Sequence, residues 1–270
     1  MISRSEAEEL VVIALAVARE AGALVESGWR RSVHADHKGP VDLVTAFDRT
    51  SEELLRERLH ARTAFPVVGE ERGADAGKQG SAVRWYVDPI DGTTNFVHGH
   101  PFYCVSVGLL GENDAPVLGA IVAPSLRTEW AGIAGAWATR NGEACRVSRV
   151  DRFIDALLAT GFPYDRHTSD DNNFDAFVAI KKRCQAVRRC GSAALDMCLV
   201  ADSTYDGYWE KKLGPWDIAA GAAIVLGAGG RISGFDGGDA QILSGSMVAT
   251  NGAIHGALLG ALAGTAAPAR

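Results

Sequence analysis

The stretch that decides the fold is Trp85-Tyr86-Val87-Asp88-Pro89-Ile90-Asp91-Gly92-Thr93-Thr94-Asn95-Phe96. An apolar run ends at Asp88, and Pro89 then fixes φ and removes a backbone N–H, so we expect a strand that leaves its sheet here. Asp91 follows three residues later on the same tight turn. Two carboxylates this close repel each other unless a cation lies between them. A pair of Mg²⁺ ions at this turn would use Asp88 as the bridge and Asp91 as a ligand of one of them.

Other acidic residues lie at the ends of apolar segments elsewhere in the chain. Val67-Val68-Gly69 is a short apolar run that leads into Glu70, and Asp217 begins an apolar helix. Each has an ordinary explanation alone: a solvated turn acid for Glu70, a helix cap for Asp217. The stretch around Asp88 could likewise be a turn with solvated aspartates. Three such segments in one chain favour a shared metal site.

The apolar periodicity indicates alternating helices and sheets. Amphipathic helices are predicted over 5–28 and about 45–61, and apolar helices over 193–200 and 218–228. Short β-like runs begin near residue 65, including a hairpin that turns near Gly135. This pattern predicts a layered α/β fold of the α+β type. We expect one unit over residues 1–270, with approximate lobes 1–150 and 151–270.

Charge and composition exclude several classes of protein. The chain has 270 residues with 27 basic and 33 acidic side chains, so its net charge of −6 makes a nucleic-acid partner unexpected. Five cysteines without a CxxC pair are typical of reduced thiols in a cytoplasmic protein. No signal peptide or membrane-spanning run is predicted, so no membrane partner is expected.

Four blocks of sequence, in order along the chain, resemble the inositol monophosphatase family of Mg²⁺-dependent, lithium-sensitive phosphomonoesterases. The blocks are Lys38 to Thr45, which is the weakest, Gly69-Glu70-Glu71, Trp85 to Gly99, and Trp216-Asp217-Ile218-Ala219-Ala220-Gly221 continued through Gly229-Gly230. The resemblance spans about residues 5–262. It implies a layered αβαβα sandwich of the sugar-phosphatase kind, a homodimer, and hydrolysis of a phosphate monoester by a metal-activated water.

The resemblance also implies a role for particular residues. Two or three Mg²⁺ ions would be bound at the positions that match the family's metal ligands: Glu70, Asp88, the Ile90 carbonyl, Asp91 and Asp217. Asp88 would be shared between two ions, and Glu70 would also help to bind the third. The amides of Gly92 and Thr93 would bind the substrate phosphate, in agreement with a turn that can approach an anion closely. The Thr93 hydroxyl, oriented by Asp42, would help to activate the water.

The second half of the chain is expected to bind the alcohol part of the substrate. By resemblance, the turn Gly191-Ser192-Ala193 would contact polyol hydroxyls, together with Asp217 and Glu210. Glu210 could instead be a surface acid. A basic cluster is either a solvated face or an auxiliary phosphate or partner site; its members are Lys181, Lys182, Arg183, Arg188 and Arg189.

The substrate favoured by the sequence is an inositol monophosphate, because Thr94-Asn95 follows Thr93 as in the inositol monophosphatase branch. Histidinol phosphate and fructose 1,6-bisphosphate are the alternatives within the enzyme class. A regulatory protein that binds the transcription machinery is the alternative of another class. All of the implied metal ligands are present, and this disfavours a purely non-catalytic role.

Overall fold

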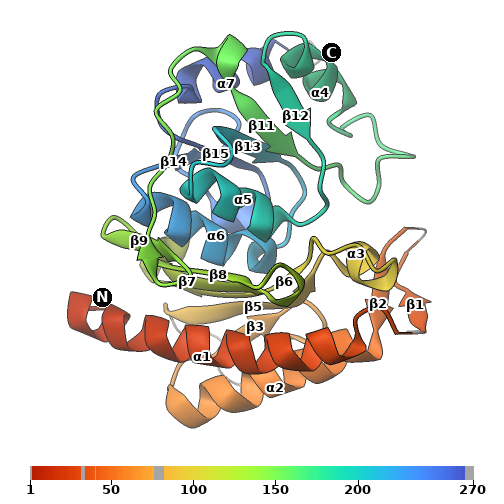
Figure 1. Ribbon diagram of the computed structural model, residues 1–270, viewed down its shortest axis with the longest axis vertical. Helices are drawn as coiled ribbons and strands as arrows, with labels where there is room; N and C mark the ends of the chain where they lie inside the picture. Colours follow the sequence, from red (N-terminus) through yellow and green to blue (C-terminus); the bar gives the residue numbers. More distant parts are fainter. Residues whose placement is uncertain (1, 32–33, 40, 76–81, 265–270) are drawn as a thin grey trace.

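The fold is described from a computed structural model over residues 2–31, 34–39, 41–75 and 82–264. Pro40, within the weakest block of the resemblance, lies outside the described residues. Figure 1 shows five layers that alternate between helices and sheets. The predicted αβαβα sandwich is therefore confirmed.

The first two layers are a pair of helices and a large sheet. Helices α1 (Arg4–Gly28) and α2 (Ala46–Arg62) pack on each other and cover one face of an eight-stranded sheet (Figure 1). The strand order in this sheet is β10-β9-β8-β7-β6-β5-β3-β4. The strands are β3 (Val67–Gly69), β4 (Gly73–Ala74), β5 (Arg84–Asp91), β6 (Cys104–Leu110), β7 (Pro116–Ala123), β8 (Thr128–Ile133), β9 (Trp137–Arg140) and β10 (Glu143–Ala144).

The middle layer consists of α5 (Ala193–Ala201) and α6 (Pro215–Gly227), which separate the two large sheets (Figure 1). Beyond them lies a five-stranded sheet of order β12-β11-β13-β15-β14. Its strands are β11 (Leu157–Thr160), β12 (Ala186–Arg188), β13 (Gly207–Glu210), β14 (Arg231–Ser233) and β15 (Met247–Thr250). Helices α4 (Phe174–Lys181) and α7 (His255–Ala263) form the last layer.

Short elements complete the structure near one end of the large sheet. Strands β1 (Ala35–His37) and β2 (Leu43–Thr45) form an antiparallel ribbon close to α3 (Thr93–Val97) (Figure 1). Elsewhere in the described residues, 3₁₀ turns lie at Glu112–Asp114, Pro124–Leu126, Phe153–Asp155 and Ile242–Ser244. No helix within the described ranges is long and apolar enough to span a membrane.

The first two helices begin at side-chain caps. Ser3 accepts a hydrogen bond from the Glu6 amide and begins α1. Thr45 caps α2 in a capping box with Asp48. Both helices thus lie within a few residues of their predicted limits.

Two glycines allow α6 to approach the large sheet closely. A Cβ atom on Gly119 of β7 would lie 2.3 Å from the Ala220 carbonyl oxygen, and one on Gly108 of β6 would lie 2.5 Å from the Ala220 amide. Only glycine avoids these backbone overlaps. This close packing fixes the first turn of α6, which carries Asp217, beside the strands that carry the other acids.

Candidate metal and substrate site

A β-bulge brings the two aspartates of β5 to the same side of the sheet. Asp88 pairs with Ser106 and Asp91 with Cys104, so three residue steps on β5 match two on β6. In a regular strand, residues three apart point to opposite faces, and the extra residue of the bulge reverses this relation. Both carboxylates consequently line one cavity between the layers.

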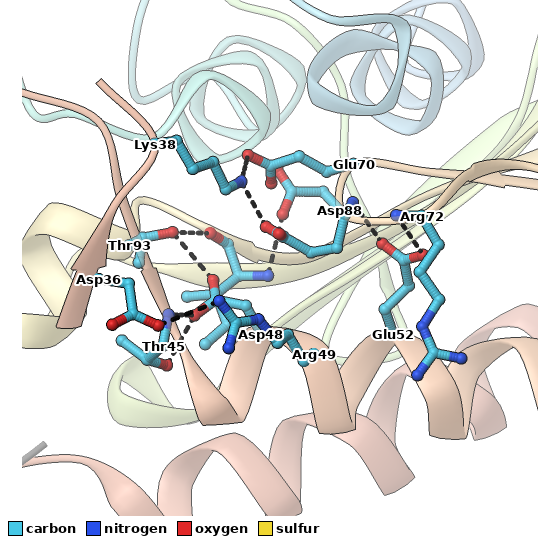
Figure 2. A network of polar contacts seen from close by, with 12 residues as sticks. Asp36, Lys38, Thr45, Asp48, Arg49, Glu52, Glu70, Arg72, Asp88 and Thr93 are labelled. Carbon is cyan, nitrogen blue, oxygen red and sulfur yellow. Dashed lines mark hydrogen bonds and ion pairs between the residues drawn. The ribbon is translucent and has the colours of Figure 1, made fainter. Parts of the chain in front are cut away.

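Glu70 is positioned by the buried Glu52 of α2, which sequence reasoning missed. The Glu52 carboxylate accepts hydrogen bonds from the amides of Glu71 (2.6 Å) and Arg72 (3.1 Å) and from Arg56 Nε (2.9 Å). Figure 2 shows this carboxylate beneath the turn that carries Glu70. A Cβ on Gly69 would lie 2.5 Å from the Glu52 carboxyl carbon, so a side chain there would displace this carboxylate from its hydrogen bonds.

Asp217 reaches the cavity from the first turn of α6. One of its carboxylate oxygens, Oδ2, accepts a hydrogen bond of 2.7 Å from the Gly214 amide. The cap predicted as its ordinary explanation is therefore present, and the same side chain also lines the cavity. A cap and a metal ligand are compatible, because a carboxylate has two oxygens.

The cavity has a volume of about 280 Å³ and brings together every residue that the sequence singled out for the site. Six of these residues are acidic: Asp42, Glu70, Asp88, Asp91, Glu210 and Asp217. The others are Ile90, Gly92, Thr93, Gly191, Ser192 and Ala193. They come from both large sheets and from the helix layer between them.

Burial and mutual repulsion make these carboxylates hard to ionise. Burial raises the pKa of Glu70 to about 7 and that of Asp91 to about 6, the latter against hydrogen bonds from Ser192 and Ala194. Burial, followed by the neighbouring carboxylates, also raises the pKa of Asp88 and of Asp217 well above the ordinary range. A multivalent cation would relieve this repulsion.

Lys38 already contacts the acidic turn. Its Nζ lies 2.9 Å from Glu70 Oε1 and also donates to Glu71 (Figure 2). Burial lowers the pKa of Lys38, but the two carboxylates outweigh burial and raise it. The ammonium thus supplies positive charge at the edge of the acidic cavity.

The donor chemistry of the cavity fits Mg²⁺. Carboxylate and backbone carbonyl oxygens are the hard ligands that this ion prefers, and four predicted carboxylate ligands and the Ile90 residue line the same space. Among the residues that the structure describes, no three histidine, cysteine or acidic side chains already form a compact cation cage. The carboxylates surround the cavity instead.

The prediction that Asp42 orients Thr93 is wrong, because Asp48 occupies that position. The Thr93 hydroxyl lies 3.0 Å from Asp48 Oδ1 and 3.0 Å from the Ile90 carbonyl oxygen (Figure 2). Asp48 is fully buried, and its other oxygen accepts from the Thr45 amide (2.7 Å) and hydroxyl (2.6 Å). Asp42 only lines the cavity. The capping-box spacing of Thr45 and Asp48 was the signal that could have identified the acid.

Ser192 supports a predicted metal ligand in addition to lining the substrate side. It caps α5, and its hydroxyl donates to Asp91 Oδ2 at 2.7 Å, the same oxygen that accepts from the Ala194 amide at 2.7 Å. The Ser192 hydroxyl therefore donates its one proton to Asp91. A contact with a polyol hydroxyl would have to use the lone pairs of Ser192 Oγ.

Glu210 is held at the cavity wall by its own strand. Tyr208 donates a hydrogen bond of 2.6 Å to Glu210 Oε2. A Cβ on Gly161 would lie 2.0 Å from Glu210 Oε1, so the carboxylate packs against bare backbone. Burial raises the pKa of Glu210 to about 7. The side chain is half-buried in the cavity wall, unlike a solvated surface acid.

The structure separates the members of the basic cluster. Lys181 ends α4, and Arg183 stacks over Phe153 with its guanidinium carbon 5.8 Å from the ring centroid. Arg188 is exposed on β12. Arg189 alone among the five lines the acidic cavity.

Comparisons with known proteins agree over nearly the whole chain. A model of the inositol monophosphatase family matches residues 6–267. Inositol-1-monophosphatase of Synechocystis is 38% identical, covering 94% of this chain and 89% of that protein. The Nus factor SuhB of Pseudomonas aeruginosa is 36% identical, covering 90% and 92%. The solved structure of inositol monophosphatase from Anabaena (Nostoc) has a TM-score of 0.87 at 37% identity and covers 96% of both chains.

Proposed function

The chain belongs to the inositol monophosphatase family and is a phosphomonoesterase, and on this premise we propose that it hydrolyses inositol monophosphate with two or three Mg²⁺ ions. The observation that carries the proposal is the collection of six carboxylates around one cavity beside the Gly92-Thr93 turn. A phosphate dianion cannot approach these charges unless cations compensate them. The reaction therefore requires bound metal.

The proposed ligands of the ions are Glu70, Asp88, the Ile90 carbonyl, Asp91 and Asp217. Three features support this assignment. The bulge in β5 places Asp88 and Asp91, the Glu52 carboxylate holds the turn that carries Glu70, and the cap of α6 holds Asp217 at the cavity wall. Bound Mg²⁺ would lower the pKa of a coordinated water and stabilise the leaving alkoxide. The amides of Gly92 and Thr93 are proposed to bind the phosphate.

Thr93 is proposed to orient the attacking water, and Asp48 to position Thr93. The Thr93 hydroxyl has one proton, and two acceptors lie within 3.0 Å of it. Donation to Asp48 leaves the lone pairs of Thr93 Oγ1 free to accept a hydrogen bond from the water. Asp48 does not line the cavity and acts through Thr93 in this arrangement.

The proposed function is tested by measuring phosphate release from myo-inositol 1-phosphate by the purified protein at a series of Mg²⁺ concentrations. We expect activity that requires Mg²⁺, disappears after chelation, and is inhibited by Li⁺. Full turnover after exhaustive chelation would exclude the proposed mechanism. Histidinol phosphate and fructose 1,6-bisphosphate are assayed in parallel, because they are the alternative substrates within the same chemistry.

Replacement of Glu210 is expected to weaken recognition of the alcohol part of the substrate and to leave the Mg²⁺ dependence unchanged. A charge-assisted hydrogen bond to a buried ligand contributes about 1.5–3 kcal/mol, so Glu210→Gln should lower kcat/KM on inositol 1-phosphate by about ten- to hundredfold. Hydrolysis of p-nitrophenyl phosphate should change much less, because its leaving group has no hydroxyl for Glu210 to bind. Equal losses on both substrates would assign Glu210 to the fold or the metal site.

A regulatory role is the second candidate function. Its support is the similarity to the Nus factor SuhB of Pseudomonas aeruginosa. The presence of every implied metal ligand in one cavity favours the enzyme, and the phosphate-release assay discriminates between the two functions. The homodimer implied by the family resemblance stays a prediction, as does the cytoplasmic location inferred from the cysteines.

A further inference from the structure

Two turns of the proposed site touch each other although they come from opposite halves of the chain. The phosphate turn is Gly92-Thr93, and the alcohol turn is Gly191-Ser192-Ala193. A Cβ on Gly92 would lie 3.1 Å from the Gly191 carbonyl oxygen, and both glycines have a left-handed backbone, with φ of 96° and 88°. The turns thus pack backbone against backbone, and whatever fixes this contact fixes the spacing between the two binding regions.

The side chain of Asn95 connects the two turns. It lies in α3, just beyond the phosphate turn, and its Nδ2 is 2.8 Å from the carbonyl oxygen of Cys190, the residue that precedes the alcohol turn. The same nitrogen is 2.6 Å from the Phe102 carbonyl oxygen and 3.4 Å from that of Gly191. The Asn95 carbonyl in turn accepts a hydrogen bond of 2.8 Å from the His100 amide. Asn95 is therefore bonded at the same time to the loop that follows α3 and to the start of the alcohol turn.

The amide chemistry of Asn95 suits this position. All three of these neighbours of Nδ2 are carbonyl oxygens, which only accept hydrogen bonds, and a side-chain amide nitrogen has two hydrogens to donate. The two nearer carbonyls, of Phe102 and Cys190, can therefore each receive one. An aspartate would place an oxygen against these acceptors, and a serine would be too short to reach both. The contacts give a physical reason for an asparagine in the sequence Thr93-Thr94-Asn95.

A second, independent contact holds the alcohol turn from the metal side. Ser192 Oγ and the Ala194 amide both donate to Asp91 Oδ2 at 2.7 Å. The other side of the turn, at Cys190, is held by Asn95 instead. Loss of the Asn95 side chain would thus free one side of the alcohol turn and leave intact the hydrogen bonds of Asp91, a proposed metal ligand.

We propose that Asn95 is a positioning residue that sets the spacing between the phosphate turn and the alcohol turn, so that the enzyme selects phosphate monoesters of polyols that reach both turns at once. The inference rests on the proposed function, because it places the phosphate at Gly92-Thr93 and the polyol hydroxyls at Gly191-Ser192-Ala193. Asn95 does not line the acidic cavity and acts through the backbone of the alcohol turn. A displaced turn lowers the rate for substrates whose orientation depends on it.

The test compares Asn95→Ala with the wild type on myo-inositol 1-phosphate and on p-nitrophenyl phosphate, whose leaving group has no hydroxyl for the alcohol turn. We expect Asn95→Ala to lower kcat/KM on inositol 1-phosphate by about tenfold, mainly through KM, because the turn contacts the alcohol before and during bond cleavage. Hydrolysis of p-nitrophenyl phosphate and the Mg²⁺ concentration for half-maximal activity should each change less than about twofold. Asn95→Ser, which keeps a polar group at this half-buried position, should show the same difference between the two substrates.

The matched control is Asn251→Ala. Asn251 is likewise an amide that joins distant segments, because its Nδ2 lies 2.8 Å from Ser148 Oγ and 2.7 Å from the Val150 carbonyl oxygen. It lies outside the acidic cavity. Its loss should lower Tm and leave the ratio of kcat/KM on the two substrates at the wild-type value, because this amide supports only the fold.

Three outcomes would overturn the proposal. In the first, Asn95→Ala and Asn95→Ser weaken hydrolysis of both substrates equally, or both variants fail to fold. In the second, neither variant weakens hydrolysis of inositol 1-phosphate. In the third, Asn251→Ala produces the same difference between the substrates. In each case Mg²⁺-dependent release of phosphate from inositol 1-phosphate by the wild type still stands, whereas absence of that release from every monoester tested would reject the proposed function itself.

Discussion

Asp88→Asn is expected to lower the rate of Mg²⁺-dependent phosphate release by about a thousandfold, which corresponds to about 4 kcal/mol of lost transition-state stabilisation. The reason is the central place of Asp88 among the acids, since the carboxylates of Glu70, Asp91 and Asp217 all raise its pKa in addition to burial. A carboxylate in that place can bind more than one ion. Asp91→Asn and Asp217→Asn should therefore lose less activity than Asp88→Asn.

Stability measurements separate this effect from unfolding. Asp88→Asn removes one charge from a buried group of like charges, so the metal-free variant should be at least as stable as the metal-free wild type. Mg²⁺ should raise the Tm of the wild type and raise that of the variant much less, because a ligand stabilises only the state that binds it. Asp155→Asn, which alters an exposed carboxylate paired with Arg152 outside the cavity, is the matched control and should keep full activity. An Asp88→Asn enzyme that outperforms Asp217→Asn would contradict the bridging role.

Thr93→Val is expected to lower kcat by about a hundredfold with little change in KM, because the hydroxyl orients water in the transition state. Valine keeps the branched shape and removes only the hydroxyl. Asp48→Asn should have a similar effect, since its carboxylate accepts the Thr93 proton. The double variant should lose much less than the product of the two single losses, because the two residues act as a unit.

Asp42 provides the comparison for this double-mutant cycle of Thr93 and Asp48. Asp42 lines the cavity, but the Thr93 hydroxyl bonds to Asp48. Combining Asp42→Asn with Thr93→Val should therefore give additive losses in activation free energy. Additivity between Asp48 and Thr93, or strong coupling between Asp42 and Thr93, would reject the arrangement. The coupling energies are calculated from the kcat and KM of each variant on inositol 1-phosphate.

Much of the site could be predicted from local sequence. The apolar strand that carries Asp88, the turn at Gly92, and the acid at the start of an apolar helix are all short-range patterns. The predicted exit of the strand from its sheet at Pro89 is wrong, because β5 continues through a bulge to Asp91 and keeps its pairing with β6 there. The layered fold follows from the same patterns, because amphipathic helices and apolar strands must bury their faces against one another.

The bulge in β5 could not be predicted in this way. Sequence spacing alone would place Asp88 and Asp91 on opposite faces of a regular strand. Where β5 pairs with β6, β5 contains one extra residue. This bulge turns both carboxylates toward the cavity. Likewise, nothing in the sequence of the basic cluster distinguishes Arg189 from Arg188, and only the folded structure places Arg189 at the acidic cavity and leaves Arg188 exposed.

The sequence by itself determined the kinds of ligand and, through the family resemblance, the order of the layers. The tertiary structure decided which acid contacts which group. Asp42 and Asp48 lie six residues apart in one segment, and both are plausible partners for Thr93 on residue type alone. The packing of α2 against β5 selected Asp48, because the capping box at Thr45 aims its carboxylate at a hydroxyl 45 residues further along the chain. A contact between such distant segments depends on how whole elements pack, and local spacing carries no information about that distance.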